Sequence, residues 1–514
     1  MLLIFPPVAK PCEPPAGIAL LSSALKENGI DCKCIDANVD GLLWLINSVG
    51  KDKATDSWTR RALKNRAAIL NDLGNPDLYT NVDRYHQRVY DLNHLVAVSV
   101  DRSRFRISLS DYSDNQLSSV DSTALLDSAA SYRENPFFPY FEEKLRPVIE
   151  SWNHAWIGIS LCYLNQALVG FALAGWIRDN FPGKILVMGG GLISSWMSRP
   201  DFNNPFSSLI DHLVKGEGES PLLALLGKPG MEKKHYVPDY GFADNYDYIA
   251  PAKILPFRAS IGCYWSKCRF CPEKAETRPY STQRADRVLG DLDVMVENHN
   301  PGVVHFIDNA VTPAFLHALA RQACAFKWYG FVRFEKDFAD PQFCRALKQS
   351  GCEMLKLGLE SGDQKVLDDM GKGTDLELAS ATLANLKAAG ILTFVYLLFG
   401  THYEDEAAAY RTLDYIKAHK SDIDYLNLSV FNLPKFSEDA KGLVTHEFYH
   451  GDLSLYLNFE HPGGWTRRNV KSFIDKEFKK QLGVGSRFRK NPAFFSSNHA
   501  MFFNNLDGPQ THIQ

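Results

Sequence analysis

Short apolar runs alternate with segments of helical spacing along the first 230 residues. The run "LLIF" precedes "GIALLSSALKENG", where apolar residues recur every three or four positions until Gly29 ends the pattern. Later runs repeat this alternation, and a chain that alternates strands with helices forms a parallel sheet through right-handed crossovers. The sequence therefore predicts one open α/β domain over residues 1–230. Its strands are expected near residues 2–7, 31–38, 156–161, 184–191 and 211–219.

A different composition interrupts this alternation between about residues 48 and 150. The segment is rich in Asp, Asn, Ser and Arg and has only scattered helical periodicity. We therefore expect a mostly helical insertion within the first domain, with a flexible stretch near residues 107–120.

A second alternation follows a linker at residues 231–256. Helical segments separate most of its apolar runs, and six parallel strands fit a partial barrel better than a second flat sheet. We expect a partial (β/α)6 barrel over residues 257–435. Residues 436–514 are irregular and aromatic-rich, which predicts a C-terminal cap with one helix at 469–483. The barrel strands are expected at residues 256–262, 303–308, 328–334, 354–361, 392–400 and 424–433.

The composition narrows the class of protein. Of 514 residues, 45% are hydrophobic, and the formal net charge of -4 provides no basic face for nucleic acid. The longest apolar run, Ile391 to Phe399, is too short for a membrane-spanning helix, and prolines interrupt the apolar amino terminus. We therefore expect a cytoplasmic protein without a membrane span. In that compartment the ten cysteines are predicted to be reduced thiols or metal ligands, not disulfides.

Three of the cysteines lie within nine residues. Cys263, Cys268 and Cys271 have the spacing C-x4-C-x2-C and follow the first predicted strand of the second domain, where barrel active sites lie. Buried core cysteines and a zinc loop are the alternatives. Core cysteines rarely gather in a polar loop, however, and structural zinc takes a fourth ligand, whereas no His or Cys follows within 25 residues. Three thiolates on a four-iron cluster would leave one iron open to bind and activate a ligand.

The stretch "GCYWSKCRFC", with Phe270 before the last cysteine, resembles the cluster loop of the radical S-adenosylmethionine (SAM) superfamily. In that family three cysteines hold a [4Fe–4S] cluster, whose open iron chelates the amino and carboxylate groups of SAM, and one electron cleaves the sulfonium. The usual spacing is C-x3-C-x2-C, so this chain has one extra residue between its first two cysteines. The resemblance covers about residues 250–435.

The same resemblance implies further contacts at the ends of the barrel strands. "LGLESG" would direct Glu360, as a catalytic residue, and Ser361 toward the SAM or substrate cavity, and "LLFGTHYEDE" resembles the fifth-strand turn. The alternative for each position is an ordinary strand-end residue or helix cap. The SAM-binding residues that the resemblance implies are Phe270, Asp308, Asn309, Arg333, Glu360, Ser361, Gly400 and Glu404.

Residues 1–230 resemble the Rossmann-like cobalamin-binding domain that precedes the barrel in one branch of the superfamily, through "DANVDG", "GISL", "MGGG" and "GEGE". Asn38 occupies the position of the histidine in the DxHxxG pattern, so no histidine ligand to cobalt is expected there. The insertion is long for such a domain, and it would cover the corrinoid, bind substrate or fill the corrinoid site. A scaffold without cobalamin is the alternative. The cobalamin-binding candidates are Asp36, Asn38, Gly41, Ser160, Gly189, Gly190, Glu217, Gly218 and Glu219.

A competing motif, "HEFYH", matches the H-E-x-x-H pattern of zinc hydrolases at His446, Glu447 and His450. That pattern needs a stable helix to bring both imidazoles to one face. Here glycines flank the motif closely, and the following "LSLYLNF" alternates as a strand does. We therefore treat it as a chance match.

Taken together, the resemblance implies a radical SAM enzyme that cleaves SAM reductively for cobalamin-dependent C-methylation of an unactivated carbon. The alternatives are a radical SAM enzyme without cobalamin that performs rearrangement, cyclisation or aminocarboxypropyl transfer, a zinc hydrolase, and a non-catalytic cobalamin or light sensor. The expected partners are an electron donor such as flavodoxin or ferredoxin and a small-molecule or peptide substrate, with no nucleic acid. The substrate itself is not readable from the sequence.

Overall fold

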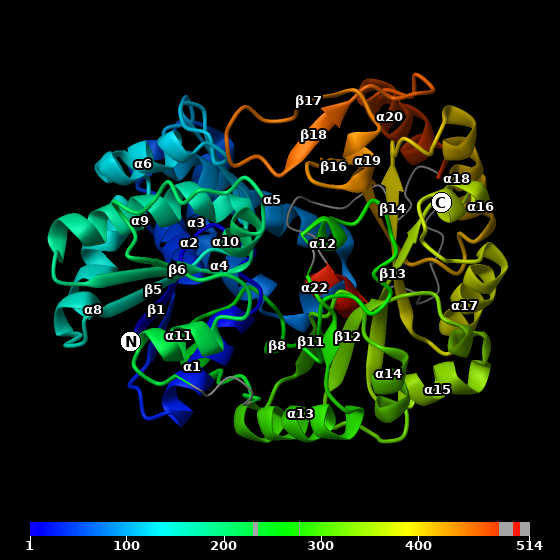
Figure 1. The fold of residues 1–514 in the computed structure, drawn as a ribbon, viewed down its shortest axis with the longest axis horizontal. Helices are drawn as coiled ribbons and strands as arrows, with labels where there is room; N and C mark the ends of the chain where they lie inside the picture. The colour runs from blue at the N-terminus through cyan, green and yellow to red at the C-terminus, as the bar shows by residue number, and fades with distance from the viewer. Residues whose placement is uncertain (230–234, 277, 483–496, 504–514) are drawn as a thin grey trace. The chain divides into compact units, whose positions relative to one another are not determined.

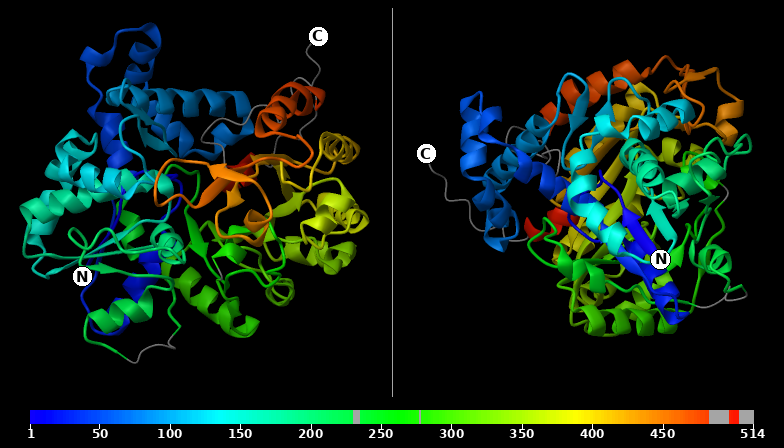
Figure 2. Two further views of the ribbon diagram at one scale, coloured as in Figure 1. Left: turned by 45° about the horizontal axis from the view of Figure 1, so that its top comes forward. Right: turned by 90° about the vertical axis from the view of Figure 1, so that its left-hand side faces the viewer.

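The computed structural model describes residues 1–514 except 230–234, 277, 483–496 and 504–514 (Figures 1 and 2). Contacts divide the chain into two compact units. The first is formed mainly by Met1–Leu255 and the second mainly by the residues from Pro256 onward, while the short segments Glu297–His299 and Tyr449–Ser454 group with the first unit.

The first unit contains the predicted parallel sheet. Its central strand, β1, has the sequence "LLIF" and all four residues are buried, as expected for a strand with helices on both faces. Figure 1 shows helices α1 and α11 on one side of this sheet and α9 on the other. The strands run in the order β2 (Lys33–Asp36), β1 (Leu2–Phe5), β5 (Trp156–Ser160), β6 (Ile185–Gly189) and β7 (His212–Leu213). The helices that cover them are α1 (Ala16–Glu27), α2 (Ala37–Ser48), α9 (Ala167–Asn180), α10 (Gly191–Met197) and α11 (Glu219–Leu225).

The insertion is mostly helical, but the stretch expected to be flexible contains a β-hairpin. Strands β3 (Phe105–Ile107) and β4 (Tyr112–Asp114) pair antiparallel, with Ile107 opposite Tyr112. Phe105, Ile107 and Tyr112 are buried, and Arg104 is 3.0 Å from Asp114, so packing and an ion pair hold the hairpin. The main helices of the insertion are α3 (Ser57–Lys64), α4 (Arg66–Leu73), α5 (Val82–Ser99), α6 (Ser122–Ala130), α7 (Phe138–Tyr140) and α8 (Arg146–Ser151).

The segment expected to be a linker packs on the first unit. Lys26 on α1 is 2.5 Å from Asp239, and the Tyr248 hydroxyl donates to Asp36 at the end of β2 over 2.8 Å. Because these side chains anchor it, the described part of residues 235–255 groups with the first unit and includes a 3-10 turn at Gly241–Asn245.

The second unit is built on a six-stranded sheet, which confirms the predicted α/β class. Five of its strands pair in parallel, and β8 lies beside β11, where the Ile307 amide donates to Phe257 over 3.0 Å. Helices α13 to α18 cover its outer side (Figure 1). The strands run in the order β15 (Tyr425–Val430), β14 (Leu392–Phe399), β13 (Cys352–Glu360), β12 (Lys327–Val332), β11 (Val303–Phe306) and β8 (Ile254–Phe257). The helices are α13 (Ala285–His299), α14 (Pro313–Leu319), α15 (Pro341–Gln349), α16 (Gln364–Asp369), α17 (Leu376–Ala388) and α18 (Glu406–Ala418).

The first predicted barrel strand is two strands. After β8, the chain leaves the main sheet and forms β9 (Ser260–Ile261), which pairs antiparallel with β10 (Ser281–Thr282). Asp308 causes this departure, because its carboxylate accepts hydrogen bonds from the Ala259 amide and the Ser260 hydroxyl.

The C-terminal region is more regular than expected. It contains a three-stranded antiparallel sheet in the order β16 (Leu433–Pro434), β18 (Tyr456–Phe459) and β17 (Thr445–Glu447). The predicted helix at 469–483 is present as α20 (Arg467–Phe473), a π-helical turn at Ile474–Phe478 and α21 (Lys479–Gln481). Two short helices, α19 (Glu438–Lys441) and α22 (Ser497–Ala500), complete the described part.

The zinc-hydrolase alternative lacks its helix. His446 and Glu447 lie on strand β17, and the His446 imidazole is 3.1 Å from Glu460. Among the described residues, no three His, Cys, Asp or Glu side chains are placed to hold one metal ion. The match to H-E-x-x-H therefore does not form the predicted zinc platform.

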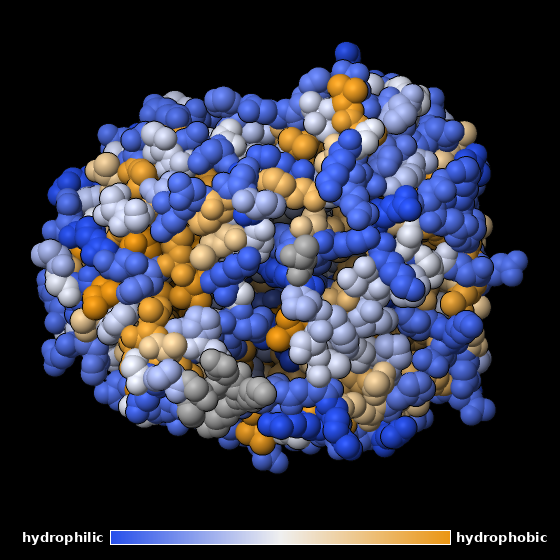
Figure 3. All heavy atoms as spheres, viewed as in Figure 1, coloured by the Kyte–Doolittle hydropathy of each residue, from blue (hydrophilic) through white to orange (hydrophobic). Residues whose placement is uncertain are grey.

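The described helices include none that is long and apolar enough to cross a bilayer. On the face drawn in Figure 3, hydrophilic residues predominate and apolar residues form small groups.

Candidate active site

The cysteine loop connects β9 to α12 (Pro272–Ala275) at the carboxyl end of β8. Ser266, in the four-residue spacer between Cys263 and Cys268, has a left-handed backbone with φ of 48°. A positive φ is uncommon for a non-glycine residue, and here it lies within the C-x4-C spacing that is one residue longer than usual. Cys268 is buried, and Cys263 and Cys271 are half-buried.

The loop is fastened to the segment that follows α16. The Arg269 amide donates to the Met370 carbonyl over 2.9 Å, and the Trp265 indole donates to the Gly371 carbonyl over 3.0 Å. Gly373 has a φ of 67°, and a Cβ atom there would be 2.1 Å from the Trp265 ring. Glycine is therefore required for the indole to pack at this point.

Burial and nearby cations shift the pKa of the loop thiol Cys268 in opposite directions. Burial raises the pKa of Cys268, whereas the charges of Lys372 and Arg333 lower it. Burial raises the pKa of Cys271 to about 11. The protein alone therefore favours neutral thiols, and binding of a metal group would release protons from them, as metal–thiolate bonding requires.

The donor set fits an iron–sulfur cluster. Three thiols lie on one loop beside two cations that compensate thiolate charge, and no described group of three ligands could share a single metal ion. A [4Fe–4S] cluster has a separate iron for each thiolate, so it spans cysteines that one zinc ion could not.

Glu360 forms a buried ion pair beside the loop. Its carboxylate is 2.9 Å from Lys372 Nζ, and the two side chains are only 11% and 6% exposed. Glu360 has a φ of 68° at the end of β13, an uncommon conformation for a non-glycine residue and one that concentrates at functional sites. A Cβ atom at Gly358 would be 2.7 Å from Glu360 Oε1, so a glycine makes room for the carboxylate.

Arg333 lies next to this pair at the end of β12. Its Nη2 donates to the Lys372 carbonyl over 2.6 Å, and its guanidinium lies 4.3 Å from the centre of the Trp265 ring. Its buried Nε makes no hydrogen bond within the described residues, although Glu335 Oε1 is 3.6 Å away. A guanidinium N–H that has an ion-pair contact but no hydrogen bond is suited to donate to a further carboxylate.

Phe270 and Asp308 make contacts with other parts of the protein. Phe270 packs against the core of α16, and Lys372 Nζ lies 5.8 Å from its ring centre. Asp308 accepts hydrogen bonds from the Ala259 amide and the Ser260 hydroxyl over 3.0 and 2.6 Å, and burial raises its pKa. Asn309 is exposed and hydrogen-bonds to Glu273. A contact of these residues with SAM stays a prediction, and the structure gives Asp308 a role in starting the cysteine loop.

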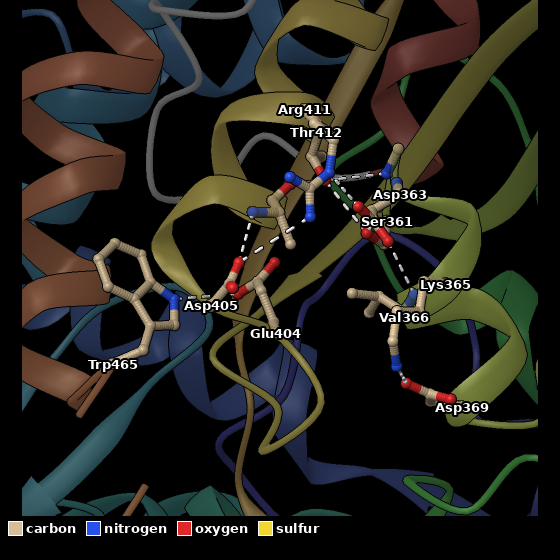
Figure 4. Close-up of polar contacts among 12 residues, drawn as sticks. Ser361, Asp363, Lys365, Val366, Asp369, Glu404, Asp405, Arg411, Thr412 and Trp465 are labelled. Carbon is tan, nitrogen blue, oxygen red and sulfur yellow. Dashed lines mark hydrogen bonds and ion pairs between the residues drawn. The ribbon is translucent and has the colours of Figure 1, made fainter. Parts of the chain in front are cut away.

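Ser361 is directed toward α18, not toward the sheet interior (Figure 4). Its hydroxyl is 3.1 Å from the Thr412 hydroxyl and accepts from the Asp363 amide over 3.1 Å. Asp363 also forms an ion pair with Arg411 of α18. These contacts fasten the turn after β13, and with it Glu360, to a neighbouring helix.

Glu404 is buried at the turn after β14. Its Oε2 accepts from the Gly400 amide over 2.6 Å. The same oxygen accepts from the Trp465 indole over 3.2 Å (Figure 4). Its Oε1 has no partner among the described residues, and burial raises the pKa of this carboxyl to about 7. Gly400 has a φ of 81° and packs against Val470, so this glycine makes room for the C-terminal region.

In the first unit, the predicted glycines lie at the carboxyl ends of β6 and β7. A Cβ atom at Gly190, which has a φ of 103°, would be 2.4 Å from the Leu161 carbonyl oxygen. Gly189 ends β6, and Gly218 and Glu219 begin α11 directly after Glu217. Ser160 ends β5, with its hydroxyl 3.7 Å from Cys162 Sγ. Gly190 therefore lets the chain after β6 pack closely against the backbone that follows β5.

The other cobalamin candidates have partners inside the protein. Asp36 accepts from the Asn38 amide and caps α2, and burial raises its pKa to about 7. The Asn38 side chain accepts from the Ala9 amide over 2.7 Å, so it fastens the loop after β1. Gly41 was expected near a strand end but lies within α2, where its missing side chain lets Phe137 pack. These contacts bind the insertion and the loop after β1 to α2.

The insertion also reaches the carboxyl end of β5. Asn165 Nδ2 donates to the Ser110 carbonyl in the turn of the β3–β4 hairpin over 2.9 Å. Among the three roles considered for the insertion, this position favours covering or filling the edge where the glycines gather.

Lys372, Trp265 and Trp465 were not found by sequence reasoning. The signal for Lys372 is its place between two glycines in "GKG", because paired glycines in a loop permit close approach of the backbone. The two tryptophans carry no local signal, since each acts on a residue far away in the sequence.

Comparisons with known proteins agree with this geometry. Residues 259–416 match the family model of the Radical SAM superfamily. The bacteriochlorophyllide d C-12(1)-methyltransferase of Chlorobaculum tepidum is 24% identical over 279 residues, which are 52% of this chain and 60% of that protein. The anaerobic magnesium-protoporphyrin IX monomethyl ester cyclase of Rubrivivax gelatinosus is 23% identical over 45% of this chain and 48% of that protein. The chain thus spans about half the length of the curated relatives that it matches.

Structural similarity extends over both units. The radical SAM methyltransferase TsrM from Kitasatospora setae, solved with tryptophan substrate and a SAM analogue bound, matches with a TM-score of 0.56 at 14% identity. The matched region covers 94% of this chain and 89% of the TsrM chain. A second structure of the same enzyme, with cobalamin and a [4Fe-4S] cluster bound, matches with a TM-score of 0.50 at 14% identity. The matched region covers 85% of this chain and 76% of that TsrM chain. Residues 259–416 of this chain therefore match the Radical SAM superfamily, and the fold of the chain is similar to that of TsrM.

Proposed function

We propose that this protein is a radical SAM enzyme that methylates an unactivated carbon with the help of cobalamin. The observation that carries the proposal is the cysteine loop, in which Cys263, Cys268 and Cys271 are fastened beside the buried Glu360–Lys372 pair in a radical SAM domain. When bound to these thiolates, a [4Fe–4S] cluster supplies the electron that cleaves the sulfonium of SAM.

The residues around the loop bind and orient SAM. Arg333 Nε is a buried donor without a hydrogen bond in the described part of the chain, and it binds the methionine carboxylate. Lys372 holds the Glu360 carboxylate in place, so that one of its oxygens accepts a hydrogen bond from SAM. Trp465 lies over the turn after β14 and excludes water from Glu404.

The first domain is the proposed cobalamin site. The proposal is supported by the similarity of the fold to that of a structure solved with cobalamin, and by the carboxyl ends of the parallel strands, where ligands bind in open α/β sheets. Cobalamin, when bound, carries the methyl group. Because the Asn38 side chain is engaged by the Ala9 amide, this chain contributes no ligand to cobalt from that position.

A radical SAM enzyme without cobalamin is the second candidate. The observation that favours it is the contact between Ser110 and Asn165, which brings the insertion to the same carboxyl edge. In this case the reaction would be a rearrangement, a cyclisation or an aminocarboxypropyl transfer.

Radical SAM enzymes need a reductant, and we propose an acidic electron carrier such as flavodoxin or ferredoxin. Lys267, Arg269 and Lys274 are exposed on or next to the cysteine loop and provide complementary charge. The substrate is proposed to be a small molecule or a peptide, and the site of action the cytoplasm.

Labelled SAM tests the methyl transfer. Protein purified without oxygen is reconstituted with iron and sulfide and incubated with reductant and methyl-deuterated SAM, with and without methylcobalamin. S-adenosylhomocysteine that forms only with cobalamin, and retention of cobalamin through gel filtration, support the proposal. Cleavage of SAM without cobalamin binding favours the second candidate instead. Cys324→Ala, which removes a half-buried cysteine outside the loop, is the matched control for the cluster cysteines.

A further inference from the structure

Two thiols on the edge strand of the first sheet share one face. Cys32 directly precedes β2 and Cys34 is its second residue, and side chains two residues apart in an extended chain lie on the same side. Both lie near α1, because Cys34 Sγ donates to the Ile18 carbonyl over 3.6 Å and Ser22 of the same helix lowers the pKa of Cys32. The two thiols are close enough that each shifts the pKa of the other.

The two thiols differ in how accessible they are to solvent. Cys34 is 7% exposed and belongs to the hydrophobic core beneath α1. Cys32 is half-buried and lines a surface cavity of 530 Å³ together with Lys26 and His154. A reagent in the cavity therefore meets Cys32, and Cys34 lies directly behind it.

The pKa values of the two thiols are also shifted in opposite directions. The neighbouring Cys34 thiol lowers the pKa of Cys32, and the charge of Lys26 acts in the same direction against the effect of burial. The Cys32 thiol and burial together raise the pKa of Cys34 well above its usual range. One member is thus favoured as a thiolate and the other as a thiol that stabilises it. A low-pKa, accessible cysteine beside a resolving cysteine is the arrangement of redox-sensitive thiols.

We propose that Cys32 is a reactive thiol that hydroperoxides oxidise, with Cys34 as its resolving partner. The Cys32 thiolate attacks the peroxide, the O–O bond breaks, and an alcohol or water leaves while Cys32 becomes a sulfenic acid. The Cys34 thiol then attacks Cys32, the S–O bond breaks, water is released, and a disulfide forms. Two electrons pass from the two thiols to the peroxide, and a dithiol reductant returns the pair to its reduced state.

The geometry predicts that this disulfide is reversible. Residues two apart in a strand have Cα atoms, and on one face also Cβ atoms, about 6.6 Å apart, whereas a disulfide needs Cβ atoms about 3.5–4.5 Å apart, so its formation requires the backbone at Cys32 to bend and leaves the bond strained. Strained and accessible disulfides are more easily reduced than relaxed ones. Strand β2 is at the edge of the sheet, with a partner strand on one side only, so its start has room to adjust.

Alkylation rates test the reactivity of Cys32 directly. The full-length protein is treated anaerobically with a limiting amount of iodoacetamide, and the label is measured on each cysteine by peptide mass spectrometry. Trypsin cleaves after Lys26, Lys33 and Lys51, so Cys32 and Cys34 are read on separate peptides. We expect Cys32 to be labelled faster than Cys34 and Cys324, because its pKa is lowered whereas theirs are raised, and the thiolate is the form that reacts. The pKa of the half-buried Cys324 is raised to about 11 by burial, which makes it the matched control. Labelling of Cys32 no faster than Cys324 would overturn the proposal.

Oxidation tests the role of Cys34. After brief exposure to hydrogen peroxide, the wild-type digest is expected to contain the two peptides joined by a disulfide that a dithiol removes. In Cys34→Ser, a sulfenic acid at Cys32 is expected to persist and react with dimedone, and in Cys32→Ser no oxidation of Cys34 is expected. Equal oxidation of Cys34 in the presence and absence of Cys32 would overturn the assignment. Because the readout is confined to these peptides, the result does not depend on the proposed function of the second domain.

Discussion

Replacing Glu404 with glutamine is expected to remove a pH-dependent loss of stability. Burial raises the pKa of this carboxyl from 4.5 to about 7 in the folded protein. The folded state therefore binds the proton more tightly than the unfolded state does. This contribution to stability is fully present below pH 4.5 and is lost as the pH rises through about 7.

The size of the effect follows from the shift. At 1.36 kcal/mol per pKa unit, the full contribution is about 3.4 kcal/mol, and the part lost between pH 5.5 and 8.5 is about 2 kcal/mol. Glutamine keeps an oxygen that accepts from the Gly400 amide and the Trp465 indole. Its buried amide group adds a cost of about 1–3 kcal/mol that does not vary with pH. The pH dependence, not the absolute stability, is therefore the informative quantity.

Denaturant unfolding, followed by tryptophan fluorescence at pH 5.5 and 8.5, measures this dependence. We expect the wild-type protein to lose about 2 kcal/mol relative to Glu404→Gln over this range. Glu406→Gln is the matched control, because Glu406 is exposed at the start of the adjacent helix α18. Equal pH dependence in wild type and Glu404→Gln would refute the reasoning that burial controls this carboxyl.

Two further substitutions test the contacts around the cysteine loop. Lys372→Met is expected to destabilise the protein by about 3–5 kcal/mol in urea unfolding, because it leaves the Glu360 carboxylate buried without its cation. The double variant with Glu360→Gln should recover part of this lost stability, because the buried charge is then removed. A loss below about 1 kcal/mol would contradict the burial of the pair. Gly373→Ala is expected to lower the iron bound per chain after reconstitution, because its Cβ atom would displace Trp265. Gly390→Ala has the same left-handed strain but open space around it, so equal iron loss in both variants would argue against the clash.

The strand pattern could be predicted because the buried strands are continuous apolar runs. All nine residues of β13 are buried, and such runs bounded by helical segments are typical of parallel sheets. The β3–β4 hairpin was missed because its strands have only three residues each in a polar segment. Their pairing depends on an ion pair and on packing that no local pattern reveals.

The site was predictable where the chemistry is local in sequence. Three cysteines within nine residues indicate a metal centre on their own, and the Radical SAM family model matches residues 259–416, which include them. Lys372 was not predictable, because its ion pair with Glu360 forms only when the chain after α16 turns back toward the end of β13. Ser361 was expected to face the cavity, but a hydroxyl in a turn readily bonds to nearby backbone and side chains, and here Thr412 and the Asp363 amide engage it.

The most direct test of the account is reductive cleavage of SAM by the reconstituted protein, measured by mass spectrometry of its products. The account predicts that wild-type protein with about four irons per chain cleaves SAM, and that replacing Cys263, Cys268 and Cys271 with alanine abolishes both the bound iron and the cleavage. Cleavage that survives loss of the three cysteines, or its complete absence from wild-type protein that carries the cluster and is supplied with reductant, would contradict it.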